Sequence, residues 1–292
     1  MKQGWFIWLF LLFIWACEMK EEHAFQHTIA VEGWIEEGDV PYVILTQTVP
    51  FFSVLDSVAM EDMVIRWAKV SVSDGEHSEI LAGRIDKNYF PPFIYRGIQL
   101  VGEAGKTYTL KVEYSGRTWE ATTTIPPSVK LDTLIAKRLP DSDTLKNIEA
   151  TFHDPVGEKN YYRLHTRIWN KDSRYIGSLM GNLDDNLFDG QEMKTSVFQG
   201  LNLIQKQNFN PYFHISDTVL IKFTTTTEFG FRYWTAYENE IINSQNPFLP
   251  AVKNLPSNIP GGKGIWCGYG KQEYIILPDT LNTHTQKNPP TQ

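Results

Sequence analysis

The sequence predicts a mainly β protein, with an N-terminal immunoglobulin-like β-sandwich followed by a second β-rich domain with one helix. Three observations support this prediction. Most segments after about residue 28 alternate apolar and polar residues, which is typical of half-buried strands. Turn-forming pairs such as Asp74-Gly75 separate these segments. One stretch, near residues 228–244, instead has the spacing of an amphipathic helix.

The clearest strand pair is a predicted β-hairpin around Ser115-Gly116-Arg117. Every second residue of "YTLKVEY" (108–114) is apolar or aromatic, and "TWEATTTI" (118–125) alternates in the same way. A short loop that contains glycine joins the two segments. We therefore expect two paired antiparallel strands.

Further strands are predicted before this hairpin. "TIAVEGWI" (28–35), "YVILTQT" (42–48) and "AKVSVSDGEHSEIL" (68–81) have strand-like patterns. Pro126-Pro127 then removes two backbone donors and stiffens the chain. These features predict an immunoglobulin-like sandwich over residues 28–127.

Residues 128–281 are predicted to form the second domain. "KNIEATFHDP" (146–155), "NYYRLHTRIW" (160–169) and the β-branched "TVLIKFTTTT" (218–227) indicate strands. The helix near 228–244 follows, and Asn246-Pro247 ends the pattern. The polar residues 282–292 are expected to form a disordered tail.

The N-terminal segment is typical of a secretory signal peptide. Lys2 precedes a wholly apolar run from Trp5 to Trp15, and the small residue Ala16 follows. Eleven helical residues extend about 16 Å, which is roughly half of a membrane's hydrocarbon core. We therefore predict a signal peptide over residues 1–16. A short uncleaved anchor is the alternative.

"IWAC" resembles the lipobox of bacterial lipoproteins, although Trp15 is bulkier than usual in that motif. The resemblance implies that Cys17 becomes the first mature residue and carries a covalent lipid, with residues 17–27 as a lipidated tether. Lys20, Glu21 and Glu22 resemble the export signal that sends lipoproteins of Bacteroidota-type cells to the outer face of the outer membrane. A charged, solvated tether is the alternative interpretation.

The net charge argues against a nucleic-acid-binding protein, and the cysteine content argues against a protein held together by disulfides. The formal charge is −7, which disfavours nucleic-acid binding, since that function needs a basic surface. The two cysteines are Cys17 and Cys267. With Cys17 lipidated, we predict no disulfide and expect Cys267 to be a small buried hydrophobe.

The sequence contains no recognisable catalytic constellation. It has no HExxH pair, and His23 and His27 lie in the tether, where their spacing is best explained as incidental. "GGKG" (261–264) departs from the phosphate-loop pattern and is better interpreted as a flexible turn. We therefore predict no catalytic residue and no cofactor apart from the lipid on Cys17.

The densest acidic segment is "DDNLFDG" (184–190). Asp184, Asp185, Asn186 and Asp189 could offer oxygen ligands to calcium, but their spacing does not match an EF-hand loop. A turn rich in Asx residues is the favoured interpretation. No metal site is predicted here.

Aromatic residues beside prolines are the strongest candidates for binding. Such rings contact sugars or a protein partner at little entropic cost, although they can equally fill the ends of a β-sandwich. The candidate interface residues are Tyr89, Phe90, Phe93, Tyr95, Phe209, Tyr212, Phe213 and Phe248.

Several short blocks resemble one known family when taken in order. They include "IAVEGWI", "TQTVPF", "GKTYTLKVEYSGRTWEATTTIPPSVKLDTL", "FHDPVGEKNYYRL", "NLFDGQ", a late "NPF" and "GKGIWCGYG". Together with the lipobox, they resemble the lipoprotein family called domain of unknown function 4249. The resemblance implies a surface lipoprotein whose gene often lies beside that of a TonB-dependent outer-membrane transporter. It provides no established catalytic or binding residues.

The leading hypothesis is therefore a surface-exposed outer-membrane lipoprotein that is a non-catalytic accessory or lid of a TonB-dependent transporter. Its role would be capture or uptake of a small ligand that the sequence does not identify. One alternative is a structural or adhesive surface module. Another is a hydrolase that uses carboxylates distant in sequence.

Overall fold

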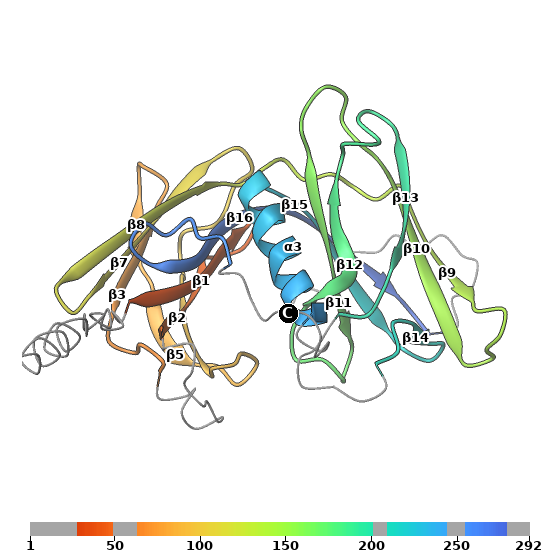
Figure 1. The fold of residues 1–292 in the computed structure, drawn as a ribbon, viewed down its shortest axis with the longest axis horizontal. Coiled ribbons are helices and arrows are strands. Elements are labelled where there is room, and N and C mark those ends of the chain that lie inside the picture. The colour runs from red at the N-terminus through yellow and green to blue at the C-terminus, as the bar shows by residue number, and fades with distance from the viewer. Residues whose placement is uncertain (1–27, 49–62, 201–208, 244–254, 279–292) are drawn as a thin grey trace, which may run out of the picture.

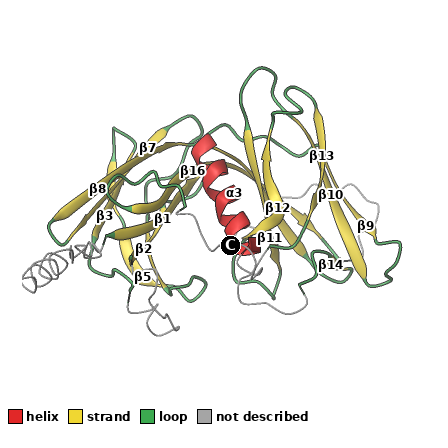
Figure 2. Cartoon of the chain, viewed as in Figure 1, coloured by secondary structure: helices red, strands yellow, loops and turns green. Residues whose placement is uncertain are grey.

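The computed structural model describes residues 28–48, 63–200, 209–243 and 255–278. In these ranges the chain forms two β-lobes with one long helix between them (Figures 1 and 2). The predicted mainly β fold with one helix is therefore confirmed. None of the helical residues described forms a helix long and apolar enough to cross a membrane.

The strands of the first half are β1 (Ile29–Glu36), β2 (Tyr42–Gln47), β3 (Lys69–Ser73), β4 (Ser78–Ile80), β5 (Ala82–Ile85), β6 (Phe93–Arg96), β7 (Thr107–Tyr114) and β8 (Arg117–Thr124). The second half contains β9 (Thr133–Arg138), β10 (Leu145–His153), β11 (Tyr161–Ile168), β12 (Ile176–Asp184), β13 (Glu192–Val197), β14 (Phe213–His214), β15 (Val219–Thr226), α3 (Glu228–Asn243) and β16 (Lys263–Ile276).

One large sheet runs through both lobes. Its eight strands have the order β12-β11-β15-β16-β1-β2-β6-β5. A four-stranded sheet, β4-β3-β7-β8, covers its first-lobe half. A second four-stranded sheet, in which β10 pairs with β9, β13 and β14, covers the other half. Each lobe is therefore a β-sandwich, and the two sandwiches share one layer.

The first core lies between β1, β2 and β6 of the large sheet and β3, β7 and β8 of the small one. In β7, Tyr108, Leu110 and Val112 are buried, as the alternation predicts. The β7–β8 hairpin turns at Ser115 and Gly116, whose φ values are +50° and +74°. Positive φ at both turn residues matches the twist of the strands, and the predicted hairpin is confirmed.

The second core lies between β11, β15 and the end of β16 on one side and β9 and β10 on the other. Three rings meet at its centre. The Phe152 centroid is 4.8 Å from those of Tyr162 and Phe223, and the last two are 5.3 Å apart. The strands predicted from residues 146–155, 160–169 and 218–227 all contribute to this core.

Strand β16 joins the two lobes. Its first half pairs in parallel with β1, and its second half pairs antiparallel with β15. The turn predicted over residues 261–264 is confirmed only in part, because the strand already begins at Lys263. Cys267 is fully buried, as expected. Trp266 belongs to the first core, although it lies near the C-terminal end of the chain.

Glycines in β16 allow the segment between the lobes to cross this strand closely. A Cβ atom at Gly268 would lie 2.6 Å from the carbonyl oxygen of Thr124, and Gly270 lies equally tightly against Pro126. The Thr225 hydroxyl donates to the carbonyl of Pro127 at 2.7 Å. The Pro126-Pro127 segment therefore passes from one core to the other across the face of β16.

Helix α3 confirms the helix predicted near 228–244. Thr227 caps its N-terminus, because its hydroxyl accepts a hydrogen bond from the Gly230 amide at 3.1 Å. Gly230 lies against Cys267, and Tyr233 and Ile241 are buried. The helix covers the face of the large sheet that points away from the two cores (Figure 1).

Candidate functional site

The face of the large sheet that points away from both cores carries aromatic and charged side chains. In β1, Val31 and Ile35 enter the first core, whereas Trp34 and Glu36 point to the opposite face. In β11, Leu164 likewise enters the second core. Because strand side chains alternate, the second set of positions forms a separate layer between the lobes. We call this layer the inter-lobe face, with the members Trp34, Glu36, Tyr42, Tyr89, Arg96, Arg163, His165, Arg174, Lys222, Tyr269 and Lys271.

Three aromatic rings and two arginines form a continuous stack on this face. The rings of Trp34 and Tyr42 lie 5.3 Å apart and nearly parallel, and Tyr89 lies 5.9 Å from Trp34. The Arg96 guanidinium lies 5.1 Å from the Tyr42 ring, and that of Arg174 lies 5.3 Å from the Tyr89 ring. Cation–π attraction stabilises both ends of this stack.

The stack connects the lobes. Tyr89 belongs to the β5–β6 loop of the first lobe, and Arg174 belongs to the β11–β12 loop of the second. In the same loops the Ser173 hydroxyl donates to the carbonyl of Asn88 at 3.4 Å. Burial raises the pKa of Tyr42 to about 12, and burial also raises the pKa of Tyr89. Both hydroxyls are therefore neutral donors at physiological pH.

A buried ion cluster lies beside the stack. Glu36 is 7% exposed, forms a hydrogen-bonded ion pair with Lys222, and lies 3.3 Å from the Lys271 ammonium. Lys271 also approaches Asp39 at 3.6 Å. Burial alone would raise the pKa of the Glu36 carboxyl, but the two lysines outweigh burial and lower it. The cluster therefore holds fixed charges between the two lobes.

Arg163 is the most deeply buried arginine of this face, at 9% exposure. Its guanidinium lies 3.7 Å from the ring centroid of Trp234, on α3. The Trp234 indole donates to the Tyr269 hydroxyl at 2.6 Å, which fixes the indole in place. Burial lowers the pKa of Arg163. The Tyr269 ring also lies edge-on to the imidazole of His165.

His165 lies two residues further along the same strand. Its Nδ1 atom is buried without a hydrogen-bond partner among the described residues. Burial, followed by the charges of Arg163 and Lys222, lowers the pKa of His165 well below its usual value. The imidazole is therefore neutral, and Nδ1 is available as a donor or an acceptor according to its tautomer.

An irregular strand pairing brings α3 onto this face. Met180 has a φ of +55°, and the β11–β12 register shifts between Arg163 and His165. The Glu238 carboxylate of α3 accepts hydrogen bonds from the Met180 amide at 2.5 Å and from the Asn182 side chain at 2.8 Å. These contacts hold the C-terminal half of the helix over Arg163.

The structure separates the first group of predicted aromatic residues. Phe93 and Tyr95 are not in a loop, because strand β6 begins at Phe93 and pairs with β5. Tyr95 is buried, and its hydroxyl donates to the carbonyl of Ile65, so it supports the first core. Tyr89 belongs to the inter-lobe stack, and Phe90 is 47% exposed.

The second group of predicted aromatic residues lies in the second lobe. Phe213 is fully buried in the core, whereas Phe209 and Tyr212 are half-buried. The Tyr212 ring packs edge-on against Phe198 at 5.9 Å. Phe248 lies outside the described residues. Among the described residues of this group, only the half-buried rings of Phe209 and Tyr212 are therefore accessible to a partner.

The acidic segment forms a compact loop. Oxygen atoms of Asp154, Asp185 and Asp189 lie within 4.8 Å of one another. Asp184 and Asn186 lie outside this trio. The Asn186 amide donates to the Asp184 carboxylate at 3.3 Å, which is the arrangement of an Asx turn.

Protein groups already occupy most of these acidic oxygens. Lys159 forms an ion pair with Asp185 and also contacts Asn186. The other Asp185 oxygen accepts from the Asn160 amide at 2.6 Å, and Asp154 accepts from the amide of Gly190 at 3.1 Å. The loop is therefore explained by its own hydrogen bonds, with a lysine where a cation would bind.

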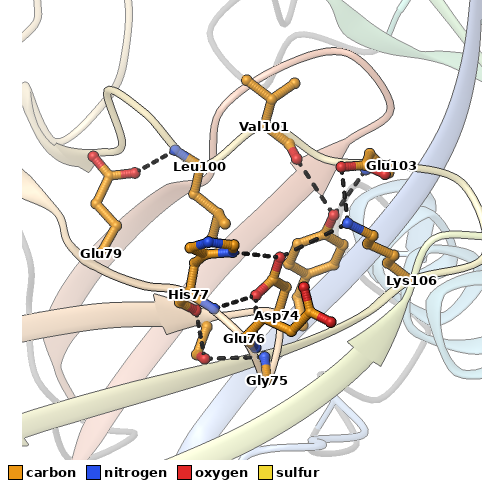
Figure 3. Close-up of polar contacts among 11 residues, drawn as sticks. Asp74, Gly75, Glu76, His77, Glu79, Leu100, Val101, Glu103 and Lys106 are labelled. Atoms are coloured by element: carbon orange, nitrogen blue, oxygen red, sulfur yellow. Dashed lines mark hydrogen bonds and ion pairs between the residues drawn. The ribbon is translucent and has the colours of Figure 1, made fainter.

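A second polar cluster lies at the Asp74 turn of the first lobe (Figure 3). The Asp74 carboxylate accepts from the backbone amides of His77 at 2.7 Å and Glu76 at 3.0 Å, and Lys106 pairs with Glu103 at 2.9 Å. The Asp74 contacts close the predicted turn, and the Lys106 ammonium, 3.9 Å from the Asp74 carboxylate, ties it to the loop before β7. The predicted lipidation and export residues Cys17, Lys20, Glu21 and Glu22 lie outside the described residues, as do His23 and His27.

The sequence profile of one family, described as domain of unknown function (DUF4249), matches residues 16–275. No curated protein matches the sequence. The family match covers most of the chain, including both lobes, α3 and nearly all of β16. The chain therefore belongs to the DUF4249 family.

Proposed function

We propose that the chain is a lipoprotein of the outer membrane, anchored through Cys17 and facing the cell exterior. The lipobox-like "IWAC" and the charged Lys20-Glu21-Glu22 segment support this location. Only the short tether would separate the lipid from β1, which begins at Ile29. The two lobes would therefore be held close to the membrane surface.

In this position we propose a non-catalytic role as an accessory or lid of a TonB-dependent transporter that takes part in substrate capture. The observation that carries this proposal is the inter-lobe face, where arginines and stacked aromatic rings meet at the junction of two lobes. Binding sites in proteins often lie at such junctions, with aromatic walls and a few polar groups. The described acidic residues that lie closest together are already occupied by protein groups, which favours binding over hydrolysis.

Exposed apolar side chains on the first lobe support contact with a protein partner. Four of them lie in or beside the segment from β4 to β6, where β5 forms the edge of the large sheet, and the fifth, Trp67, precedes β3. Exposed apolar patches mark interaction sites, and aromatic residues are enriched in interfaces. The exposed side chains are Trp67 (91% exposed), Ile80 (63%), Ile85 (74%), Phe90 (47%) and Ile98 (74%).

Co-purification tests the partner. The tagged full chain, extracted from outer membranes in mild detergent, is expected to bring a TonB-dependent transporter with it. A matched variant with aspartate at Ile80 and Ile85 is expected to bring less, whereas aspartate at exposed Leu187 of the second lobe should have no effect. A chain that repeatedly purifies alone contradicts the proposal and favours the structural or adhesive alternative.

Two further measurements test the anchor. Cys17→Ser is expected to leave an unprocessed precursor without lipid, which mass spectrometry would detect. Alanine at Lys20, Glu21 and Glu22 should keep the lipid but remove sensitivity to protease added to intact cells. Continued cleavage of that variant on intact cells would rule out the proposed export signal.

A further inference from the structure

Strand β5 has one hydrogen-bonding edge without a partner strand among the described residues. It is the last strand of the large sheet and pairs only with β6. The opposite end of the same sheet is covered. There the Leu179 amide of β12 donates to the carbonyl of Gln199 at 3.2 Å, and the Met180 amide donates to Glu238 at 2.5 Å. The two ends of the sheet therefore differ in how their backbone groups are satisfied.

The register shows which backbone groups of β5 face away from β6. In an antiparallel pair, residues that exchange hydrogen bonds alternate with residues that do not. The Asp86 amide donates to the carbonyl just before β6 at 3.3 Å, so Arg84 and Ala82, at steps of two, also bond to β6. Gly83 and Ile85 therefore direct their N–H and C=O groups to the outer side of β5.

Leu81 supports this assignment of the outer side. Its amide, two residues before that of Gly83, donates to the carbonyl of Val70 on β3 at 2.8 Å. Beyond this bond, β3 no longer pairs with the strand. The backbone groups of Gly83 and Ile85 have no hydrogen-bond partner on that side among the described residues. Each residue thus offers one donor and one acceptor to another chain.

Apolar side chains continue from the first core to this edge. Gly83 stands opposite Tyr95 in the register, and Ile85 stands opposite Phe93. The rings of Phe93 and Tyr95 lie 5.4 Å apart, and both residues pack in the first core or against it. Ile85 extends this row, since opposite residues share a face, but it is 74% exposed. An added strand would therefore cover apolar surface as well as satisfy backbone groups.

The charges at this edge favour an acidic partner. Residues 82–96 include three basic side chains, Arg84, Lys87 and Arg96, and one acidic side chain, Asp86, although the whole chain has a formal charge of −7. Lys87 forms no ion pair with any described residue, and Arg84 lies 3.7 Å from Asp86. A second copy of the chain would bring the same excess of positive charge against this edge, whereas acidic side chains complement it.

We propose that β5 is a docking edge, to which an extended segment of a partner protein adds as a further strand with alternating apolar and acidic side chains. Backbone hydrogen bonds to Gly83 and Ile85 provide affinity. The alternation provides specificity, because Ile85 lies on one face of the strand and Arg84 on the other. The proposal deepens the accessory role and rests on it only for the identity of the partner, the transporter.

Site-specific crosslinking tests the contact. A photoreactive benzophenone amino acid replaces Ile85 in the tagged full chain, and intact cells are irradiated. We expect one protein to be crosslinked here, and at least fivefold less of it from the control position Leu187, which is 92% exposed on the second lobe. Equal yields at both positions, no product at Ile85, or a product only with a second copy overturns the proposal. A partner other than a transporter supports the docking edge and contradicts only the accessory role.

Proline distinguishes strand addition from contact by side chains alone. Ile85→Pro removes an outward amide that β6 does not use, a position at which edge strands tolerate proline. Ile85→Ala removes most of the apolar side chain but keeps the amide. With melting temperatures matched, Ile85→Pro should bring down at least fivefold less of the crosslinked partner than Ile85→Ala. Equal amounts from the two variants overturn strand addition.

Charge reversal tests the acidic partner without changing the backbone. Arg84→Glu should lower the amount of co-purified partner at least threefold, because it repels acidic side chains. The matched control is Arg117→Glu, since Arg117 is an exposed arginine of the β7–β8 hairpin and lies outside the docking edge. An unchanged amount with Arg84→Glu, or an equal loss with Arg117→Glu, contradicts charge recognition at β5.

Discussion

The two faces of the eight-stranded sheet differ in what their side chains do. On the core face, Trp266 and Phe223 are buried among apolar neighbours, and the Trp266 indole donates to the carbonyl of Tyr108 at 3.0 Å. On the inter-lobe face, Arg163 and Arg174 contact rings but leave their donors unused within the described residues. The acidic loop around Asp185 is also rich in charge, but protein groups occupy most of its oxygens. The difference teaches that the number of charges in a segment does not by itself locate a candidate site.

The largest expected effect is on the core face. Trp266→Ala should lower the free energy of unfolding by about 3–5 kcal/mol, because it removes a large, fully buried side chain from the first core. Urea unfolding followed by circular dichroism measures this change. The control Trp67→Ala, at a side chain 91% exposed, should change stability by no more than about 0.5 kcal/mol. Similar losses in both variants would remove the contrast between buried and exposed positions.

A comparable loss is expected at the buried ion cluster. Glu36→Gln leaves the ammonium groups of Lys222 and Lys271 without their shared carboxylate, and should cost about 3 kcal/mol. Thermal and urea unfolding at neutral pH test this value. The control is Glu113→Gln, which breaks the pair with Lys69 at the surface and should have a much smaller effect. An equally small effect at Glu36 would show that the cluster is dispensable for the fold.

The pH dependence of stability should distinguish two groups on the inter-lobe face. The pKa of His165 is lowered by burial, so below about pH 6.5 the unfolded state binds a proton that the folded state does not. Stability should therefore fall as the pH drops below this value, by at most about 1.4 kcal/mol per pH unit for one group. His165→Gln should reduce this loss, which urea unfolding over a range of pH would measure.

The Glu36 carboxyl acts in a more acidic range. Its pKa is lowered in the folded state, so its contribution is present above the ordinary value of 4.5 and is lost as the pH falls through the lowered folded pKa. Glu36→Gln should flatten the stability profile only in that acidic range. If Glu36→Gln instead flattened the stability profile near pH 6, the acidic loss of stability would have been assigned to the wrong group.

The smallest expected effect concerns Arg174, at one end of the inter-lobe stack. Arg174→Gln should lower stability by only about 0.5–1 kcal/mol, because the residue is half-buried and its contact is a cation–π interaction with Tyr89. Urea unfolding measures this change. A loss above about 2 kcal/mol would mean that Arg174 mainly joins the lobes.

Local patterns in the sequence predicted the local elements of the fold. The β7–β8 hairpin and α3 were predictable because alternation, turn residues and helical spacing all act within a few residues. Strand β16 was only partly anticipated. Gly261 and Gly262 do lie in a turn, as predicted, but Gly268 and Gly270 in the strand itself allow the Pro126-Pro127 segment to approach the backbone closely.

The candidate site was harder to predict because its residues come from distant segments. Trp34 and Tyr42 come from the first two strands, and Arg174 comes from the β11–β12 loop. Only Tyr89 was among the predicted binding residues. One signal was present in the sequence of β1, where Trp34 and Glu36 occupy the alternate positions whose side chains point away from the first core. Which of these side chains lack hydrogen bonds depends on long-range pairing that no local pattern contains.

The position of β16 has a consequence for how the molecule is made. Trp266 completes a core whose other strands were synthesised more than a hundred residues earlier, between β1 and β8. During synthesis, the first core therefore lacks Trp266 until the C-terminal part of the chain has emerged. Contacts of such long sequence separation form slowly. The first lobe therefore stays incompletely folded, and accessible to chaperones or proteases, until nearly the whole chain has been synthesised.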